Sequence, residues 1–518
     1  MGRYLIGIDI GTYESRGMLL DSNYHVVSDC SVKHSMSNPK PGFFEHDAED
    51  IWGGDFCKIA KSLLSESHVA PEDVECVGAS ALGTDCVPVD HSCTPLRPAI
   101  LYGIDARATE EARWLTEYYG ESEVNRLFGH KINSGDTATK ILWIKNNEPE
   151  VYDRTYKFLT GSSFITAKLT GQYVIDQALA KGSFRPLYNA DGTVNEAQCE
   201  VFCRPNQLAE SRVSTDIVGT VTKAASIATG LAQGTPVVTG TGDSTSEAIS
   251  AGLVEAGTVF FQYGSSMFYY YCTDKFIDAY TSPSGNGSLK GGKDFTIPGT
   301  FCLGDGTNAA GTLTRWVRDT FYKSELLTEA TTGENAYTVM SEEASEVPVG
   351  ADGLIMLPYI YGERSPLQDS EALGMIFGLT GGHDRRHINR AALESVAYST
   401  YQHMRLFSEI GLEPERVITA GGGTKNITWM QIVCDMLGKP LQIPEDFQCS
   451  AYGDAMIAAI GSGQLAGFSA LRRVLPTGRV LVPNSENHQY YAQHYPIFRD
   501  LYLNNRSAMY TLSRENHK

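Results

Sequence analysis

A single carboxylate, Asp243, stands between a glycine-rich turn and a segment of small residues that predicts a helix. The apolar pair Val237 and Val238 precedes the turn Gly240-Thr241-Gly242. Glycines before a helix let backbone and ligand approach closely, and a carboxylate held there suits a general base that accepts a proton. Aspartate is also a preferred N-cap residue. The local sequence therefore leaves two interpretations of Asp243, a helix cap and a catalytic base.

A hairpin predicted at residues 4–21 could bind phosphate. Its expected strands are 5–10 and 17–20, and its turn contains Gly11 and Thr12, with Arg16 close behind. A turn rich in glycine and hydroxyl groups offers N–H and O–H donors to an anion, and arginine adds a fixed positive charge. Asp9, at the end of the first strand, could hold Mg²⁺ directly or through water. An ordinary hairpin is the alternative.

Two later segments repeat this pattern of strand, glycine and polar residue. Residues 257–271 predict a second hairpin whose turn contains Gly264 and Ser265. A strand at 417–420 then leads into three glycines and a helix from residue 428, an order that lets a nucleotide lie close to the backbone. A flexible loop is the alternative for these glycines. The two hairpins predict an internally duplicated fold.

Polar residues that follow two predicted strands are candidate substrate contacts. Small ligands bind at the carboxyl ends of strands in α/β folds. Strand 75–80 precedes one pair of these residues, and the apolar run at 100–101 precedes the other. Asp105 and Arg107 could instead pair with each other, and a surface pair would contribute little. The candidate contacts are Thr84, Asp85, Tyr102 and Asp105.

The elements that position these residues indicate a large α/β protein. A chain of 518 residues predicts two to four domains. Helices are expected within 109–144 and at 162–171, 388–407 and 428–437, and no low-complexity linker separates them. We place the boundary near residue 247, which gives domains 1–247 and 248–518. His46 lies in the loop before the first helix and is expected to be structural.

The composition of the chain disfavours several classes of protein, such as nucleic-acid-binding and membrane-spanning proteins. The net charge of −19 opposes binding to nucleic acid and to anionic membranes, and favours a small-molecule role. No stretch of about 18 apolar residues is present, so no membrane span is expected. Eleven cysteines without zinc-type spacing predict reduced, mostly buried thiols. With no signal-peptide pattern at the N-terminus, we expect a cytoplasmic protein.

Two long, gapped stretches resemble the signature patterns of the FGGY carbohydrate kinases. One is Gly135-Asp-Thr-Ala-Thr-Lys140-Ile-Leu-Trp143-Ile-Lys-Asn-Asn147. The other is Gly374-Met-Ile-Phe-Gly378-Leu379, then seven residues, then His387-Ile-Asn-Arg-Ala-Ala-Leu-Glu394. The resemblance covers nearly the whole chain in the right order. It implies a two-domain α/β, actin-like (ribonuclease H-like) ATPase fold with the active site in the interdomain cleft.

The resemblance also implies roles for individual residues. Asp243 corresponds to the catalytic base, which also contacts the substrate. Asp9 corresponds to the acid that helps to place Mg²⁺ and contacts the sugar. The positions that match the phosphate loops and the adenine-nucleotide site are Gly11, Thr12, Arg16, Gly264, Ser265, Gly311, Arg315, Gly422 and Asn426.

The substrate follows from weaker similarities. The stretch Pro41-Gly-Phe-Phe-Glu-His-Asp47 resembles glycerol kinases, but the segment 81–85 lacks their Arg-Glu pair. The Gln-Met-His typical of xylulose kinases is absent there too, and the Gly-Thr-Asp form is more similar to ribulokinase-type members. Residues 100–107 resemble xylulose-kinase-like proteins. We therefore expect a ketopentose, xylulose or ribulose-like, or a related polyol.

The expected activity is transfer of the γ-phosphoryl group of ATP to a sugar hydroxyl, with ATP and Mg²⁺ as cofactors. The expected partners are the sugar and ATP, with no nucleic acid and no membrane, and a homodimer is left open. One alternative is an actin-fold ATPase or ligand sensor that phosphorylates no sugar. A nicotinamide dehydrogenase is disfavoured, because Gly-x-Gly-x-x-Gly is missing after the first strand.

Overall fold

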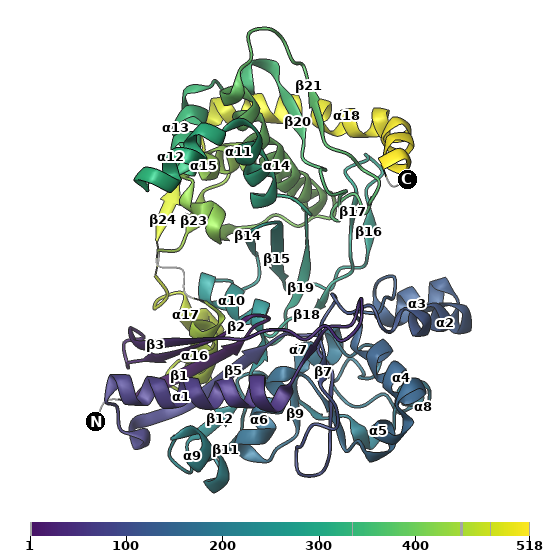
Figure 1. Ribbon diagram of the computed structural model, residues 1–518, viewed down its shortest axis with the longest axis vertical. Helices are drawn as coiled ribbons and strands as arrows, with labels where there is room; N and C mark the ends of the chain where they lie inside the picture. The colour runs from purple at the N-terminus through teal and green to yellow at the C-terminus, as the bar shows by residue number, and fades with distance from the viewer. Residues whose placement is uncertain (1–2, 334, 446–448, 477, 517–518) are drawn as a thin grey trace. The chain divides into compact units, whose positions relative to one another are not determined.

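The computed structural model describes residues 3–333, 335–445, 449–476 and 478–516. Contacts divide the chain into two compact units, each drawn in Figure 1. The division expected near residue 247 lies inside α10 (Asp243–Ala251), and the first segment of the first unit continues to Glu255. Neither unit is continuous in sequence. The first unit comprises Met1–Glu255, Lys293–Phe301 and Gln448–Leu475, and the second comprises Ala256–Gly292, Cys302–Phe447 and Pro476–Lys518.

A mixed sheet forms the centre of the first unit. Its strands run in the order β11-β12-β5-β1-β2-β3, and β13 also pairs with β5. β1 is antiparallel to β2, with Leu5 opposite Leu20, and parallel to β5. These pairings confirm the first predicted hairpin and the strand predicted at 75–80. The strands are β1 (Tyr4–Ile10), β2 (Glu14–Leu20), β3 (Val26–Lys33), β5 (Val74–Ala81), β11 (Ile217–Thr220), β12 (Pro236–Val238) and β13 (Thr241–Gly242).

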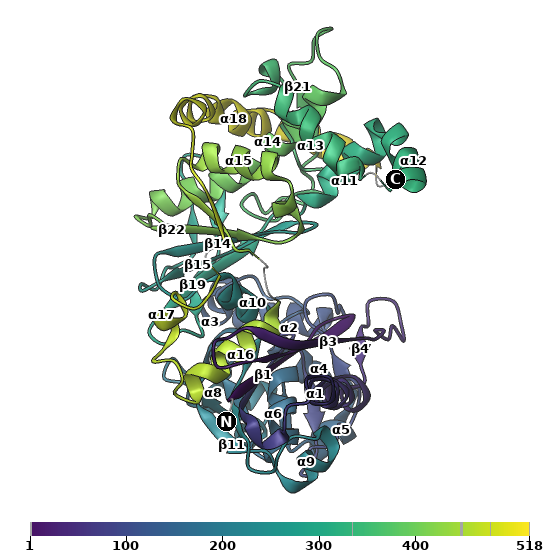
Figure 2. The same ribbon diagram turned by 90° about the vertical axis from the view of Figure 1, so that its left-hand side faces the viewer.

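Two helices, α1 (Gly54–Ser67) and α16 (Ser450–Gly461), cover opposite faces of this sheet. A Cβ added to Gly17 would lie 2.2 Å from Ile59 of α1, and Gly17 pairs with Ile8. A Cβ added to the neighbouring Gly7 would lie 1.9 Å from the backbone oxygen of Ala451 in α16. Successive residues of a strand point to opposite faces, so the two helices lie on different sides. Figure 2 shows α16 beside β1.

The rest of the first unit packs around this core. Its helices confirm the helical content expected within 109–144, and Gly171 ends α6 in the left-handed conformation, as expected. The other helices are η1 (Ala48–Gly53, a π-helix), η2 (Pro71–Asp73), α2 (Thr109–Tyr119), α3 (Glu121–Phe128), α4 (Thr137–Asn147), α5 (Pro149–Arg154), α6 (Gly161–Thr170), α7 (Gln177–Gly182), α8 (Glu196–Phe202), η3 (Pro205–Gln207), α9 (Lys223–Thr229) and α17 (Phe468–Leu471). The short strands are β4 (Glu45–His46), β6 (Val87–Val89), β7 (Ala99–Ile100), β8 (Lys157–Leu159), β9 (Val174–Asp176), β10 (Glu210–Arg212) and β18 (Lys293–Asp294).

The sheet of the second unit repeats the arrangement of the first. Its order includes β19-β15-β14-β22-β23-β24. β14 is antiparallel to β15 and parallel to β22, as β1 is to β2 and β5. The second predicted hairpin is thus confirmed, and both hairpins occupy equivalent places in their sheets. The strands are β14 (Thr258–Tyr263), β15 (Met267–Thr273), β19 (Phe301–Gly306), β22 (Arg416–Ala420), β23 (Leu441–Ile443) and β24 (Arg479–Leu481).

Helices α14, α15 and α18 stack on one side of this second sheet, as both ribbon views show (Figures 1 and 2). α14 extends a few residues beyond the expected 388–407 at each end and is buried along most of its length. The helices are α11 (Gly311–Phe321), α12 (Lys323–Thr332), α13 (Ala336–Glu346), η4 (Ala351–Gly353), α14 (Arg385–Glu409), η5 (Gly422–Lys425), α15 (Ile427–Leu437) and α18 (Ser485–Asn516). The short strands are β16 (Tyr280–Thr281), β17 (Ser288–Leu289), β20 (Ile355–Leu357) and β21 (Met375–Phe377).

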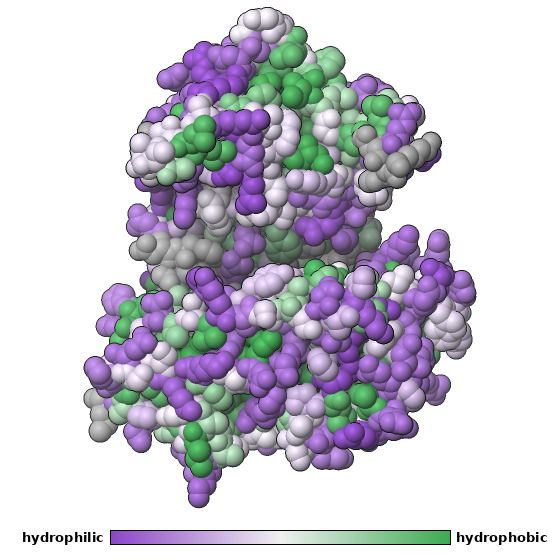
Figure 3. All heavy atoms as spheres, in the orientation of Figure 1, coloured by the Kyte–Doolittle hydropathy of each residue, from purple (hydrophilic) through white to green (hydrophobic). Residues whose placement is uncertain are grey.

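Side-chain burial agrees with the composition. All eleven cysteines are free, and all except Cys30, Cys57 and Cys449 are buried. On the face drawn in Figure 3, hydrophilic residues predominate and hydrophobic groups are small and scattered. Across the described ranges, no helix combines the length and the apolar character that a bilayer span requires.

Candidate active site

Three acidic side chains converge near the carboxyl ends of the central strands β1 and β5 of the first sheet. Asp9 lies near the end of β1, opposite Ser80 of β5. Asp243 begins α10, and Asp454 comes from α16. Burial raises the pKa of Asp9 well above its usual value, and the negative charges of Asp243 and then Asp454 raise it further. This mutual effect places the three carboxyl groups in one electrostatic cluster.

Ser80 connects two of these acids. Its hydroxyl oxygen lies 2.8 Å from Asp9 Oδ1 and 2.8 Å from Asp454 Oδ2. Ser246 donates to the other oxygen of Asp454 at 2.6 Å. A serine has one hydroxyl hydrogen, so both Ser80 contacts are hydrogen bonds only if one of the two acids carries a proton. Burial raises the pKa of Asp454 to about 8, which allows this acid to hold it.

Glycines make this close approach possible. A Cβ on Gly78 of β5 would lie 2.3 Å from the backbone oxygen of Asp454. A Cβ on Gly453 would lie 2.0 Å from the backbone oxygen of Ser246 in α10. Atoms cannot approach this closely without displacement of the backbone. Glycine at both positions therefore lets α16 bring its carboxyl group against β5 and α10.

Asp243 occupies the first position of α10, directly after the strand pair β13–β5. Gly242 is the N-cap, so the capping interpretation of Asp243 is wrong. The carboxylate instead accepts a 2.6 Å hydrogen bond from the backbone N–H of Ser244. Burial raises the pKa of Asp243 to about 6, and the contact with Ser244 opposes this shift. A carboxylate with a pKa near the working pH is suited to accept a proton.

A buried acid that sequence reasoning missed anchors the strand before Asp243. Asp176 Oδ2 accepts hydrogen bonds from Thr241 Oγ1 at 2.6 Å and from Thr296 Oγ1 at 2.8 Å. Burial raises its pKa to about 6. Because the three residues are far apart in sequence, no local pattern pointed to Asp176. Its position indicates that it holds the Thr241–Gly242 strand in place.

The predicted substrate contacts Thr84 and Asp85 lie beside Asp243. A Cβ on Gly242 would come within 3.7 Å of Gly83, and Asp243 and Asp85 repel each other electrostatically. Asp85 is fully buried, and within the described ranges neither carboxylate oxygen has a hydrogen-bond partner of good geometry. Burial raises its pKa well above the usual value, and Lys140 and the Tyr102 backbone lower it only in part. An acceptor of this kind suits a ligand hydroxyl.

The other two predicted contacts differ from each other. The Tyr102 hydroxyl accepts a 3.3 Å hydrogen bond from Thr12, so it reaches the turn of the first hairpin. The Asp105 carboxylate is fully buried and bound by Arg107, with its Oδ2 atom 2.8 Å from Nη2, and by the backbone N–H of Phe44 at 2.7 Å. The ion pair considered from the sequence is therefore present, but it is buried. A substrate contact by Asp105 stays a prediction.

The first hairpin contains the three predicted phosphate contacts of this unit, with Gly11 and Thr12 in its turn and Arg16 in β2. The backbone N–H of Gly11 donates to the carbonyl of Glu14 at 3.2 Å and closes the turn. Thr12 is half-buried. Arg16 is half-exposed and pairs with Glu14 at 3.1 Å. A phosphate contact by Arg16 would therefore replace or extend this surface pair.

One cavity of the second unit brings together every predicted nucleotide residue of that unit. Its volume is about 760 Å³, which is within the range of small-molecule sites. The N–H of Gly311 donates to the carbonyl of Gly264 at 3.0 Å, and a Cβ on Gly311 would come within 2.5 Å of that oxygen. The close contact explains glycine there. The predicted residues that line the cavity are Gly264, Ser265, Gly311, Arg315, Gly422 and Asn426.

One wall of this cavity was missed from the sequence. Helix α13 contributes Tyr337, Thr338 and Ser341 to the lining. Ser341 donates to Asn426 Oδ1 at 2.9 Å, and the same oxygen caps α15 by accepting the N–H of Trp429. The amphipathic pattern of α13 carries no ligand signal, so only the fold places it here.

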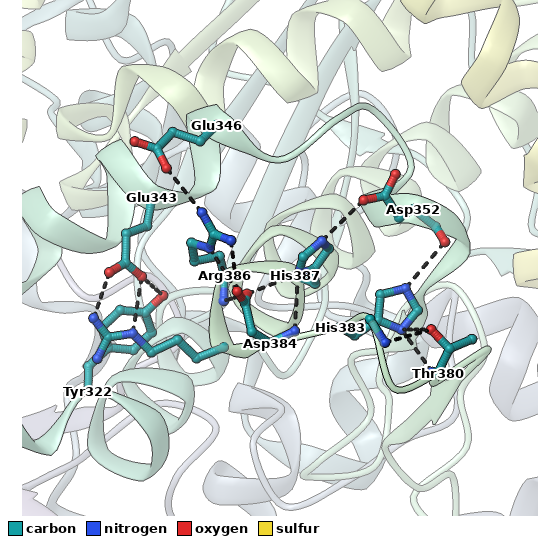
Figure 4. Close-up of polar contacts among 11 residues, drawn as sticks. Tyr322, Glu343, Glu346, Asp352, Thr380, His383, Asp384, Arg386 and His387 are labelled. Carbon is teal, nitrogen blue, oxygen red and sulfur yellow. Dashed lines mark hydrogen bonds and ion pairs between the residues drawn. The ribbon is translucent and has the colours of Figure 1, made fainter.

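Polar contacts at the start of α14 attach α13 to the rest of the unit. Arg385 pairs with Glu343 at 2.6 Å, and Arg386 pairs with Glu346 at 3.3 Å. Figure 4 shows the latter pair next to His387, which contacts Asp384 at 2.9 Å. Two separate ion pairs thus join the helices and hold the cavity wall formed by α13.

The acidic cluster has donor atoms of the type that Mg²⁺ prefers. Carboxylates such as Asp9 supply hard oxygen ligands, and Mg²⁺ is usually held by one or two carboxylates with water and phosphate oxygens. Among the described residues, no three His, Cys, Asp or Glu side chains form a metal-binding group. The oxygen donors of Asp9 are therefore of the kind that fits a magnesium ion held together with nucleotide phosphates.

Family profiles match both halves of the chain. The N-terminal domain of the FGGY family of carbohydrate kinases matches residues 4–250, and the C-terminal domain of that family matches residues 260–462. The chain belongs to the FGGY family of carbohydrate kinases. The protein is therefore a phosphotransferase that acts on a sugar with ATP as co-substrate, as the two signature stretches implied.

Individual relatives agree with this FGGY assignment. The xylulose kinase of Bacillus subtilis (strain 168) is 29% identical, covering 96% of this chain and 97% of the relative. The gluconokinase of the same organism is 27% identical, covering 97% of this chain and 96% of the relative. The crystal structure of xylulose kinase from Rhodospirillum rubrum has a TM-score of 0.85 at 28% identity, and the match covers 98% of this chain and 100% of that chain. The expected actin-like fold is thus confirmed.

Proposed function

We propose that this kinase phosphorylates a hydroxyl group of a ketopentose, xylulose or ribulose-like, or of a related polyol, with Asp243 as the general base. The observation that carries the proposal is the proximity of Asp243 both to Asp9 and to the unpaired Asp85 carboxylate. An unpaired buried acceptor favours a ligand that donates hydroxyl hydrogens. Relatives named xylulose kinase support the same class.

The charge of the site favours a neutral sugar over an aldonate such as gluconate. As the general base Asp243 must be ionised, and a substrate carboxylate beside it would be repelled. The Lys140 ammonium group is fully buried and already donates to the carbonyls of Thr84 and Gly135. It is therefore occupied and poorly placed to pair with a substrate carboxylate.

In the proposed reaction, Asp243 takes the proton of the sugar hydroxyl as that oxygen forms a bond to the γ-phosphorus. The bond between the γ-phosphorus and its bridging oxygen breaks, and ADP leaves with the electron pair. Most of the catalysis in such transfers comes from positioning and charge stabilisation. Thr12 and Ser265 would donate hydrogen bonds to phosphate oxygens. Magnesium held near Asp9 would supply neutralisation of the phosphate charge.

A coupled assay of ADP release, run across ketopentoses, glycerol and gluconate, tests the proposal. We expect ADP release to depend strictly on a neutral ketopentose or polyol. Asp243→Asn should lose about 10²-fold or more in kcat, because the base is gone, while ATP still binds in isothermal titration. ADP release without sugar would favour an ATPase or sensor. A preference for gluconate, or near-normal turnover by Asp243→Asn, would contradict the proposal.

A further inference from the structure

Two histidines hold the turn of the first hairpin from inside the protein. The ring nitrogen Nε2 of His34 lies 3.2 Å from the carbonyl oxygen of Gly11. The same atom of His46 lies 3.1 Å from the carbonyl oxygen of Thr12. His34 follows β3 and His46 belongs to β4, so two separate segments reach the same pair of carbonyls.

The contacts of His46 determine which of its nitrogens carries hydrogen. The indole N–H of Trp52 donates to His46 Nδ1 at 3.1 Å, so Nδ1 is an acceptor. A tryptophan can only donate. The hydrogen of the neutral ring must then lie on Nε2, where it points to Thr12. Burial lowers the pKa of His46 to about 4, with a further contribution from His34, which agrees with a neutral ring.

His34 is fixed by a second set of contacts. Its Nδ1 atom lies 2.9 Å from Asp55 Oδ2, and its ring meets that of His46 edge to face at 5.1 Å. Asp55 also accepts hydrogen bonds from Ser15 and Lys58, each at 3.1 Å. Ser15 is the second residue of β2, just after the turn. The histidines, Trp52 and Asp55 thus form one bracket, which we call the histidine bracket, around residues 11–15.

The bracket controls the direction of two N–H groups. In a trans peptide the carbonyl and the N–H of the same plane point in opposite directions. The Gly11 carbonyl shares its plane with the N–H of Thr12, and the Thr12 carbonyl shares its plane with the N–H of Tyr13. With both carbonyls turned towards the histidines, both N–H groups point away from them. Within the described residues, neither N–H has a recorded hydrogen-bond partner, and Tyr13 is 60% exposed.

We propose that His34 and His46 are positioning residues for phosphoryl transfer, which orient the Thr12 and Tyr13 N–H groups towards the phosphate of ATP. The inference rests on the proposed function, because it requires that this turn contacts phosphate. A satisfied core histidine would explain the burial of His46. It would not explain why two histidines from different segments, one held by Trp52 and the other by Asp55, bond to successive carbonyls of the same turn.

A pair of substitutions at His46 separates the two roles. His46→Leu keeps the volume and removes the donor. We expect it to lower kcat/KM for ATP at least about tenfold, because an oriented donor at developing charge is lost, while KM for the sugar changes less than about twofold. His46→Gln places an amide donor near the position of Nε2, so it should recover most of this loss. His91→Leu serves as control for the His-to-Leu change, because the His91 ring packs against Tyr156 and not against the turn.

If His46→Leu does not fold, His34→Leu makes the same test, with His34→Gln as the matched rescue. The inference fails if the wild-type enzyme is active and the leucine variants have the same kcat/KM for ATP as wild type. It also fails if the glutamine variants are no more active than the leucine variants. An equal change in the sugar KM would also overturn it, since that indicates general disruption. Failure of the proposed function looks different, because the wild-type enzyme itself would then show no sugar-dependent ADP release.

Discussion

The ammonium group of Lys140 donates a 2.6 Å hydrogen bond to the backbone carbonyl of Thr84. A second hydrogen bond of 2.8 Å goes to the carbonyl of Gly135, in the loop that precedes α4. Lys140 therefore ties the proposed sugar loop to the helix of the first signature stretch. This connection gives a physical reason for a buried lysine in that stretch, because a shorter or uncharged side chain would leave the Gly135 carbonyl without this donor and the Thr84 carbonyl with only the 3.4 Å hydrogen bond from Thr137 Oγ1.

Lys140→Met should weaken both folding and sugar binding. Two buried carbonyls lose the hydrogen bond from the ammonium group, so we expect a loss of about 2 kcal/mol in the free energy of unfolding and a sugar KM raised at least about tenfold. Urea denaturation and steady-state kinetics measure the two effects. Lys145→Met on the same helix is the control, because Lys145 donates to the carbonyl of Val201 instead. Equal sugar KM values for both variants would contradict this role.

The acid limb of the pH–rate profile should report Asp243. Burial raises its pKa to about 6, and a general base works only when ionised. As pH falls through about 6, the carboxylate takes up a proton and kcat/KM for the sugar should fall about tenfold per pH unit. Asp176 has a similar pKa, so Asp176→Asn is the control. If Asp176→Asn loses the acid limb, the limb reports the titration of Asp176 and not that of Asp243.

The stability of the substrate-free protein should decrease with pH because of Asp454. Its pKa is about 8 in the folded protein and near 3.8 when exposed. Between these two pH values the folded protein holds a proton on Asp454 that the unfolded protein has lost. This contribution to stability is complete below pH 4 and is lost as pH rises towards 8, by at most about 1.4 kcal/mol per pH unit. Asp454→Asn carries an amide that can still donate a hydrogen bond to Ser80. Because the amide does not titrate, the stability of this variant should lack the pH dependence that Asp454 causes. We expect the variant to gain stability relative to wild type between pH 5 and pH 8, measured by urea denaturation. Parallel slopes for the two proteins would show that Asp454 is ionised throughout.

Two substitutions at Asn426 separate its role as the N-cap of α15 from its expected role in nucleotide binding. Asn426→Ala removes the cap of α15 and should lower the free energy of unfolding by about 1 kcal/mol. Asn426→Asp keeps an acceptor for the Trp429 N–H but adds negative charge where ATP is expected to bind. Both variants should bind ATP more weakly in isothermal titration, and only the alanine variant should melt earlier. Unchanged ATP affinity in Asn426→Asp would place the nucleotide elsewhere.

Local sequence predicted the parts of the site that lie next to glycine turns. Asp9, Asp243 and the two hairpins are each recognisable within a few residues of sequence, because strands and turns have short-range signals. Gly264, Gly311 and Gly422 line one cavity, where binding of a nucleotide stays a prediction. What the local signals could not give is the state of the side chains. Arg16 is paired with Glu14, and the cap of α10 is Gly242 rather than Asp243.

Residues that act through distant partners were not predictable in this way. Asp454 sits in a helix of small residues that reads as ordinary core packing, and Asp176 ends a short strand. Each becomes significant only because the fold brings it to Ser80 or to Thr241. Similarly, His46 reads as a lone loop histidine until Trp52 and Thr12 are seen on its two nitrogens. Long-range pairing of this kind has no sequence period to reveal it.

The late position of α16 has a consequence for biosynthesis. A ribosome releases the strands of the first sheet early, but the helix that covers Gly7 and Gly78 follows only after most of the second unit has been made. A nascent chain therefore exposes one face of its first sheet, and Asp9 has no link to Asp454, until translation is nearly finished. Exposed apolar faces of this kind are where chaperones bind and aggregation starts. Premature termination before residue 450 would accordingly yield an inactive, aggregation-prone fragment rather than a partly working kinase.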